Sequence, residues 1–204
     1  MIPRVRFDRE TVWRLVPTRF PGIHVFGRLT ADGAETAILE EAETESNARI
    51  QLFGPEDALV KAPFAYPHPD GSRFSDGSFG VWFGAVEQET AFAEMAWHRT
   101  RSLVYTAAPA MVLQYRMIRA EVTGDLADIR GMAEVMPEVY DPVDYLASRR
   151  FAVQVRQEGG EGVAFDSVRR RAGTCLGLFV PTAIRNCQHA FHTTMHWDGQ
   201  VLHT

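Results

Sequence analysis

The sequence predicts one α+β domain, in which a mixed β-sheet packs against a few helices. Three observations support this fold class. The chain has 204 residues, which is close to the size of one large domain and is enough to bury a complete core. Hydrophobic residues make up 46% and charged residues 23%, as in soluble globular proteins. Segments with strand-like patterns outnumber helical ones and do not alternate with them regularly, which argues against a doubly wound α/β sheet.

The N-terminal half contains two predicted strands and one predicted helix. The first strand covers residues 12–16. Two Asp-Gly turns then bracket a short segment within residues 70–77. Residues 80–84 follow as a buried strand, and residues 89–98 have the composition and apolar spacing of a helix. Because this helix comes soon after the strand, Glu94 is expected in its second turn, near the edge of the sheet.

The C-terminal half is predicted to be mostly β-structure. Apolar residues alternate over residues 111–122 with one change of phase, which predicts a long strand with a bulge. Asp141-Pro142 has the pattern of an N-cap with proline at the first helical position, so a helix is expected to open there. The remaining predicted elements are strands at residues 162–166 and 176–181 and a hairpin around a two-residue Asp198-Gly199 turn.

Charge is unevenly distributed along the chain. The formal net charge is -5, which argues against general binding to nucleic acid. Between Asp32 and Asp57, eight acidic residues and only Arg49 give a net charge of -7, so the rest of the chain carries +2. We expect an acidic insertion at about residues 30–60, a solvated helix or surface segment, within a single domain that covers residues 1–204. The mildly basic remainder can receive a small anionic molecule.

The N-terminal residues and the hydropathy pattern indicate where in the cell the protein is expected. The first residues lack the apolar stretch of a secretory signal, and no window approaches about 18 uninterrupted apolar residues. Cys175 and Cys187 are too few for a disulfide framework in a chain of this size. A cytoplasmic protein with no membrane partner is therefore expected.

Common catalytic and metal-binding motifs give no further assignment. The chain has no Gly-x-Gly-x-x-Gly after a strand, no Walker loop, no His-Glu-x-x-His and no Gly-x-Ser-x-Gly. Only His192 and His196 of the C-terminal histidines would share a helical face, and the hairpin pattern places His196 on a strand. We therefore expect surface histidines and no metal site for the group His189, His192, His196 and His203.

Four polar residues lie in otherwise apolar settings. Arg14 is inside a predicted strand, Arg73 lies between two turns, Glu94 is in an apolar helix, and Ser167 follows a predicted strand. A buried charge is costly unless it is paired or used. Taken alone, each of these residues is explained by a pairing with another polar group that only stabilises the fold. Together, two arginines, a glutamate and a serine suit an anionic ligand with a polar reacting centre, since arginine binds phosphate bidentately.

These residues carry a resemblance to a known family. Four segments, in order from about Trp13 to Pro181, resemble the successive signatures of the RES domain, which is named for its arginine, glutamate and serine. On this resemblance Arg14 and Arg73 match the two family arginines, Glu94 matches the glutamate and Ser167 matches the serine. The segments are Trp13-Arg14, Gly71-Ser72-Arg73-Phe74-Ser75, residues 80–94 and residues 162–169.

The resemblance implies a mixed, split β-sheet core like that of ADP-ribosyltransferase toxins. It also implies the toxin of a bacterial toxin–antitoxin module, which consumes NAD+ by hydrolysis, by phosphorolysis or by transfer of ADP-ribose to a protein acceptor. The partner it implies is an Xre-like antitoxin whose C-terminal part blocks the NAD+ pocket. No metal and no direct contact with nucleic acid are expected.

The resemblance also implies roles for the matched residues. Glu94 would stabilise positive charge at C1′ of the ribose or bind its 2′-hydroxyl. Arg14 and Arg73 would clamp the pyrophosphate and so position C1′. Ser167 would hydrogen-bond the ribose or the nicotinamide amide, and Phe83 would supply an apolar wall.

The chain departs from the family pattern at several positions. Phe83 stands where the family usually has tyrosine, and Leu15, Phe74 and Ser75 also differ from the usual residues. A phenylalanine can stack on a nicotinamide ring but cannot donate a hydrogen bond. A second interpretation therefore stays open, in which the chain is a catalytically impaired RES-fold module that binds a nucleotide or a protein.

Overall fold

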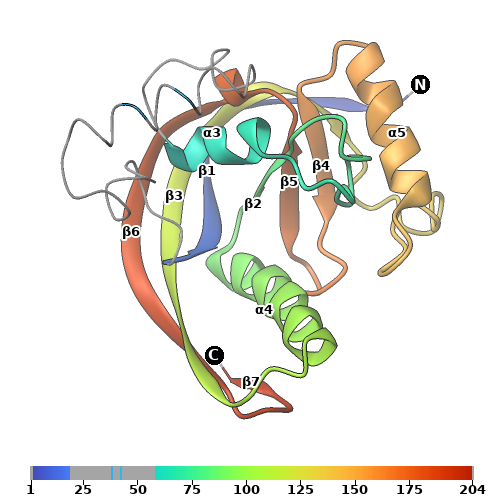
Figure 1. Cartoon of the computed structure of the whole chain (residues 1–204). Helices are drawn as coiled ribbons and strands as arrows, with labels where there is room; N and C mark the ends of the chain where they lie inside the picture. Colours follow the sequence, from blue (N-terminus) through green and yellow to red (C-terminus); the bar gives the residue numbers. More distant parts are fainter. Residues whose placement is uncertain (1, 19–37, 39–41, 43–57, 204) are drawn as a thin grey trace.

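The computed structural model describes residues 2–18, 38, 42 and 58–203 (Figure 1). Strands dominate, and helices neither alternate with them regularly nor cover both faces of a parallel sheet, so the predicted α+β class is confirmed. In chain order the elements are β1 (Arg4–Pro17), α3 (Ala58–Ala65), β2 (Trp82–Ala85), α4 (Gln88–Tyr105), β3 (Met111–Asp128), α5 (Leu146–Gln157), β4 (Gly162–Asp166), β5 (Thr174–Leu178), the short 3-10 helix η1 (Pro181–Ala183), β6 (Ile184–Trp197) and β7 (Leu202–His203).

The strands form one mixed sheet in the order β1-β2-β5-β4-β3-β6-β7, and β1 also pairs with β3. Two antiparallel groups can be distinguished. The long strands β1, β3 and β6 pair over most of their length, and the shorter strands β2, β5 and β4 pair with each other. The groups meet through Trp13↔Ala85 between β1 and β2, and through a short parallel pairing of β3 and β4. The sheet is therefore split along the side where β1 meets β2.

Two apolar clusters hold the helices on the sheet. The larger cluster contains residues of the strands β2, β3, β4 and β5, of the helices α4 and α5, and of the segment before β2. Phe74, Phe151 and Phe165 are buried in it. The smaller cluster joins the other side of the strands to α3 through Trp82 and Phe64. Figure 1 shows α4 next to the end of β2 and α5 beside β4. The site described below lies on the side of the larger cluster.

Several predicted elements agree with the structure. The strand expected at residues 12–16 is the second half of β1, and the helix expected at residues 89–98 lies within α4. The strand expected at residues 162–166 is β4. The long strand over residues 111–122 is part of β3, and it has two register shifts against β6 where one bulge was expected.

Three predicted boundaries are wrong. The carboxylate of Asp141 accepts hydrogen bonds from the backbone N–H groups of Val143 and Asp144, so it caps a loop, and α5 begins only at Leu146. The strand predicted at residues 176–181 is displaced, because β5 covers Thr174–Leu178 and Pro181 is the first residue of η1. The final hairpin has a longer loop than two residues, since Trp197 pairs with Leu202 and residues 198–201 lie between the two strands.

The acidic insertion at about residues 30–60 lies almost wholly outside the described residues, so its predicted helix is not addressed by the structure. Within the described ranges, no helix is both long enough and apolar enough to cross a membrane.

Candidate functional site

A cavity of about 630 Å³ lies between α4, β2, β5 and the segment before β2. This volume is within the range of sites for small molecules and nucleotides. Arg14, Arg73, Phe83 and Glu94 line it, although they come from distant parts of the chain. Ser167 does not line the cavity, but its side chain contacts that of Glu94. The fold therefore brings all five predicted residues to one place.

Glu94 is in the second turn of α4, as expected, and its carboxylate is held at one oxygen. The hydroxyl of Ser167 donates a hydrogen bond to Oε1 at 2.6 Å, and the thiol of Cys175 lies 3.7 Å from the same oxygen. Burial and the nearby carboxylate of Glu94 raise the pKa of Cys175, so the thiol stays protonated and can donate. No hydrogen bond from the described residues reaches Oε2, which is left for a ligand.

Ser167 is fixed by a tight turn that follows β4. Its backbone N–H donates to the carbonyl of Gly173, and its hydroxyl oxygen accepts the N–H groups of Arg169 and Arg170 at 3.1 and 3.0 Å. Because the same hydroxyl donates its proton to Glu94, its hydrogen-bonding capacity is used within the protein. The geometry makes Ser167 a positioning residue for Glu94; the contact to ribose or nicotinamide expected from the sequence stays a prediction.

Arg73 is a deeply buried charge, with 9% of its surface exposed. Its Nη1 donates to the carbonyl of Val139 at 3.1 Å, and its guanidinium carbon lies over the ring of Tyr145, 4.6 Å from the ring centroid. Nη2 is buried and has no hydrogen-bond partner among the described residues. Burial lowers the pKa of Arg73, although arginine stays charged at neutral pH. The guanidinium is therefore held in place with one donor unused.

The backbone around Arg73 is shaped by the two turns seen in the sequence. Ser72 and Ser75 pair as an isolated bridge, and Gly71 has a φ of 76°. A Cβ at Gly71 would lie 2.2 Å from the carbonyl oxygen of Ser75, so this position requires glycine. From α5, Ser148 donates to the carbonyl of Arg73 at 2.6 Å and Arg149 donates to that of Ser72 at 2.9 Å. These contacts fix Arg73 rigidly against α5.

Arg14 bridges the split in the sheet. Its Nη1 donates to the backbone carbonyl of Phe83 at 2.8 Å, and its guanidinium lies over the ring of Trp82 at 5.3 Å. Burial lowers its pKa to about 10. Nε is buried without a hydrogen-bond partner in the described part of the chain. Arg14 thus links β1 to β2 where backbone pairing is nearly absent, and its role in binding phosphate stays a prediction.

Phe83 forms part of an aromatic wall. Its ring stacks on that of Phe74, with centroids 6.4 Å apart, and Phe74 meets Phe165 edge-on at 4.9 Å. Gly177 on β5 makes room for this group, because a Cβ there would lie 3.2 Å from Cε1 of Phe83 and 3.3 Å from Cδ2 of Phe74. The wall is well suited to a flat, uncharged ring.

A comparison of the sequence with models of protein families matches the part of the chain that contains most of these residues. The family model of the RES domain matches residues 48–198, about three quarters of the chain, and so includes Arg73, Phe83, Glu94 and Ser167. The chain belongs to the RES domain family. Arg14 precedes the matched range, so its assignment depends on the resemblance of the first strand alone.

Two further proteins are similar to this RES domain chain. The uncharacterized protein y4oC of Sinorhizobium fredii (strain NBRC 101917 / NGR234) is 26% identical over 204 residues, which cover 94% of this chain and 84% of that protein. A chain in the crystal structure of the M. tuberculosis MbcT-MbcA toxin-antitoxin complex has the same fold, with a TM-score of 0.54 and 11% identity. That match covers 93% of this chain and 85% of the other.

Sequence reasoning did not identify several residues that line the cavity of this RES domain. Tyr145, His98 and Arg101 all face it. Burial against the surrounding protein and the positive charges of Arg169, Arg73 and Arg101 lower the pKa of His98 to about 4, although part of the residue is exposed to solvent. His98 is therefore neutral at pH 7. Its position four residues after Glu94, on one face of a helix, is the sequence signal that could have identified it.

Arginines outnumber acidic residues in the lining of the cavity. Arg101 and Arg169 lie over the ring of Trp97, at 4.7 and 3.3 Å from its centroid. Arg169 also donates to the carbonyl of Pro142. Arg101 lines the cavity together with Arg73. This side of the site attracts anions, as the mildly basic charge of the chain outside the acidic segment suggested.

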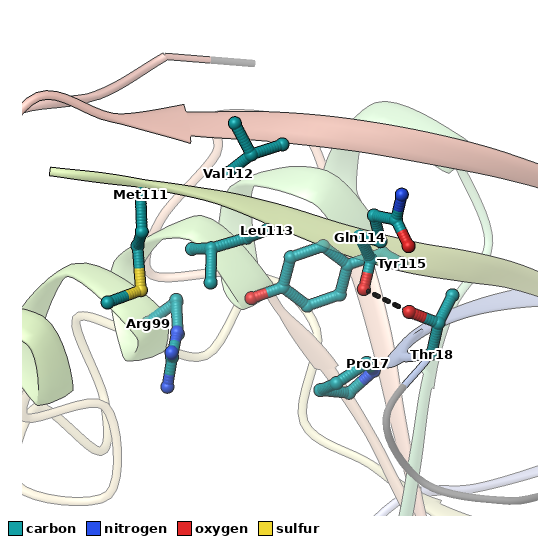
Figure 2. Close-up of a pocket in the computed structure, with 8 residues that line it drawn as sticks. All are labelled: Pro17, Thr18, Arg99, Met111, Val112, Leu113, Gln114 and Tyr115. Atoms are coloured by element: carbon teal, nitrogen blue, oxygen red, sulfur yellow. Dashed lines mark hydrogen bonds between the residues drawn. The ribbon is translucent and has the colours of Figure 1, made fainter.

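A second cavity, of about 370 Å³, lies on another side of α4 (Figure 2). Figure 2 shows Arg99 reaching from α4 to the side of β3 on which Tyr115 lies, whereas Val112 points to the opposite side. At its edge, Thr18 donates to the carbonyl of Gln114 at 3.0 Å. It contains none of the residues predicted from the sequence, so the candidate chemistry belongs to the larger cavity.

The C-terminal histidines lie on the strands β6 and β7. His196 is paired with His203 across the hairpin, so it is on a strand as predicted. The rings of His189 and His192 are 4.5 Å apart. Within residues 2–18 and 58–203, no group of three or more His, Cys, Asp or Glu side chains is arranged to hold a metal ion.

Proposed function

We propose that this protein is the toxin of a toxin–antitoxin module and that it cleaves the nicotinamide–ribosyl bond of NAD+. Membership of the RES domain family and the shared fold with a chain of the MbcT-MbcA toxin-antitoxin complex support the first part. The observation that carries the second part is the hydrogen bond from Ser167 to Glu94. It orients one carboxylate at the wall of a cavity whose other residues are mainly aromatic rings, arginines and small apolar side chains.

The proposed reaction breaks the bond between C1′ of the ribose and the ring nitrogen of nicotinamide. The bonding electron pair leaves with nicotinamide, which becomes neutral, and positive charge develops at C1′ in the transition state. The free oxygen of Glu94 stabilises this charge electrostatically or holds the 2′-hydroxyl. A nucleophile then adds to C1′ and loses a proton.

The cavity offers separate environments for the two ends of the substrate. The ring of Phe83, which lines the cavity and is backed by the buried ring of Phe74, provides an apolar surface for the nicotinamide, which leaves as a neutral ring. Arg73 has a free N–H for the pyrophosphate, and Arg14 is the second candidate for this contact. Binding at both ends would place C1′ near Glu94, as the reaction requires.

Three nucleophiles are compatible with this site. Water gives a glycohydrolase, phosphate gives a phosphorylase, and a side chain of another protein gives a mono-ADP-ribosyltransferase. Arg101, which lines the cavity, and Arg169, which lies over the same Trp97 ring, favour an anionic nucleophile or an acidic protein surface.

The proposed partner is a cognate antitoxin of the Xre-like class that blocks the NAD+ pocket. The similar chain of known structure belongs to a complex of a toxin with an antitoxin, and this supports a partner of the same kind. The proposal places the protein in the cytoplasm, where NAD+ is available, and involves neither a metal nor direct contact with nucleic acid.

The experiment that tests this proposal uses NAD+ labelled in its adenosine half. The purified protein is incubated with it, with and without phosphate and with cell extract, and free nicotinamide is measured in parallel. Label on a protein band indicates ADP-ribosyl transfer, and label on a small product indicates hydrolysis or phosphorolysis. Binding of NAD+ without release of nicotinamide would instead support the impaired binding module, which the missing hydroxyl of Phe83 favours.

A further inference from the structure

One buried donor in the larger cavity has no acceptor in the described part of the chain. Nη2 of Arg73 is buried, and the side chain as a whole is 9% exposed. An unsatisfied buried N–H is unfavourable, and native proteins contain few of them. Nη1 of the same group is satisfied by Val139 at 3.1 Å, so the guanidinium is anchored and does not need to turn. The missing acceptor is most simply an atom of the ligand.

The ring of Tyr145 covers this guanidinium. The carbon of the guanidinium lies 4.6 Å from the centroid of the ring, which is the geometry of a cation–π contact. Tyr145 also lines the cavity. Arg73 lines the cavity as well, yet its Nη2 is inaccessible, so we take the ring of Tyr145 to be the group that covers this donor.

Tyr145 is held loosely by comparison with Arg73. Its hydroxyl contacts the carbonyl of Pro142 and Nη2 of Arg169, both at 3.5 Å, which is the limit for a hydrogen bond. It precedes the first residue of α5 and follows an exposed loop over residues 142–144. Its backbone carbonyl accepts the N–H of Arg149 at 2.9 Å and the hydroxyl of Ser148 at 3.0 Å, so a displaced ring would turn about its side-chain bonds while the backbone stays fixed.

We propose that Tyr145 is a specificity residue that covers Arg73 until a ligand with an anionic group displaces its ring. This inference rests on the proposed function, because it takes that group to be the pyrophosphate of a dinucleotide. A charge-assisted hydrogen bond from Arg73 to a phosphoryl oxygen is stronger than a partly exposed cation–π contact, so an anionic ligand displaces the ring. An uncharged ligand gains no such bond and leaves the ring in place.

The test compares binding of inorganic pyrophosphate to the wild type, to Tyr145→Ala and to Tyr145→Phe by titration calorimetry. Tyr145→Ala removes the cover and is expected to bind pyrophosphate about three- to tenfold more tightly. Tyr145→Phe keeps the ring face and is expected to bind within about twofold of the wild type. Tyr105→Ala, a tyrosine that is 92% exposed on α4, is the matched control and should bind like the wild type.

The dependence on Arg73 is tested in the same series. Adding Arg73→Lys to Tyr145→Ala is expected to abolish the gain in affinity, because lysine lacks the fork that offers Nη2. If Tyr145→Ala lowers the folding stability too far, Tyr145→Leu removes the ring face while keeping bulk, and the same gain is expected. Unchanged or weaker pyrophosphate binding in a folded variant without the ring contradicts the inference.

A failure of the inference about Tyr145 can be distinguished from a failure of the proposed function. Pyrophosphate binding needs no turnover, so a protein that releases no nicotinamide can still show the effect of Tyr145. Conversely, a wild type that cleaves NAD+ but whose Tyr145→Ala variant gains no affinity for pyrophosphate retains the proposed function and overturns only this inference.

Discussion

The Glu94 side and the Arg73 side of the cavity differ in how their polar groups are satisfied. Glu94 receives the hydroxyl of Ser167 at 2.6 Å and the thiol of Cys175 at 3.7 Å, so its carboxylate is oriented before any ligand arrives. Arg73 is equally well anchored, yet one of its donors is unused and the ring of Tyr145 lies against it. The first side is arranged for chemistry and the second for binding.

This difference follows from what each group must do. A carboxylate that stabilises a developing charge acts best when it is already oriented, because no reorganisation is then needed in the transition state. A group that selects a ligand gains by exchanging a weak contact for a strong one on binding. Substitutions on the two sides should therefore change different kinetic constants, and they provide a way to test the distinction.

The largest expected effect is that of Glu94→Gln. The amide is isosteric with the carboxylate but carries no charge, so nicotinamide release should fall by at least about 100-fold. The unfolding temperature should change little, because the amide can still accept a hydrogen bond from Ser167. Nicotinamide is measured by chromatography, with Glu89→Gln, an exposed glutamate in the first turn of α4, as the control. Activity within about threefold of the wild type would rule out the role of Glu94.

The next effect is that of Arg73→Lys. Lysine keeps the charge but loses the fork and the stacking geometry, so KM for NAD+ should rise by about tenfold or more while kcat stays within about threefold. Arg150→Lys, an exposed arginine on α5, is the control. A fall in kcat at unchanged KM would place Arg73 on the chemical side and break the distinction between the two sides.

Ser167→Ala should have a smaller effect. The alanine leaves Glu94 without its short hydrogen bond and leaves two backbone N–H groups without an acceptor. We expect kcat to fall by about tenfold, with KM nearly unchanged, and the free energy of unfolding to fall by about 1 kcal/mol. Steady-state kinetics and urea denaturation measure these changes, with the exposed Ser102→Ala as control. A selective rise in KM would instead indicate that Ser167 contacts the substrate.

The smallest expected effect concerns pH and His98. Its pKa is about 4 in the folded protein against 6.5 for the free side chain, so the unfolded state binds the proton more readily. The stability that depends on His98 is complete above about pH 6.5 and is lost as the pH falls towards 4. Urea denaturation at pH 7 and pH 5 should show a smaller loss of stability in His98→Gln than in the wild type. An equal loss in both proteins contradicts this prediction.

Local patterns in the sequence predicted much of the site. The strand that carries Phe83 and the helix that carries Glu94 are close neighbours in the chain, so a strand-then-helix pattern was enough to place them. The two turns around Arg73 were also visible as Asp-Gly pairs. Arg14 and Ser167 were visible as polar residues in apolar settings, and the family resemblance assigned them to the same site as Arg73 and Glu94. The α+β class followed from the strand and helix patterns.

Long-range contacts could not be predicted in the same way. Ser167 and Glu94 are 73 residues apart, and only the folded sheet shows that the serine lies behind the carboxylate. The contact of Tyr145 with Arg73 likewise depends on where α5 begins, and the signal at Asp141 was misread because its side chain caps a loop. A helix-capping residue and a loop-capping residue look alike in a sequence.

Release of nicotinamide by the wild-type protein decides whether the protein cleaves NAD+. The protein is incubated with a large excess of NAD+ and, in parallel reactions, with water alone, phosphate or cell extract as the source of acceptor. We predict free nicotinamide in molar excess over the protein, and none from Glu94→Gln. Intact NAD+ in every reaction, with NAD+ bound but not cleaved, would contradict it.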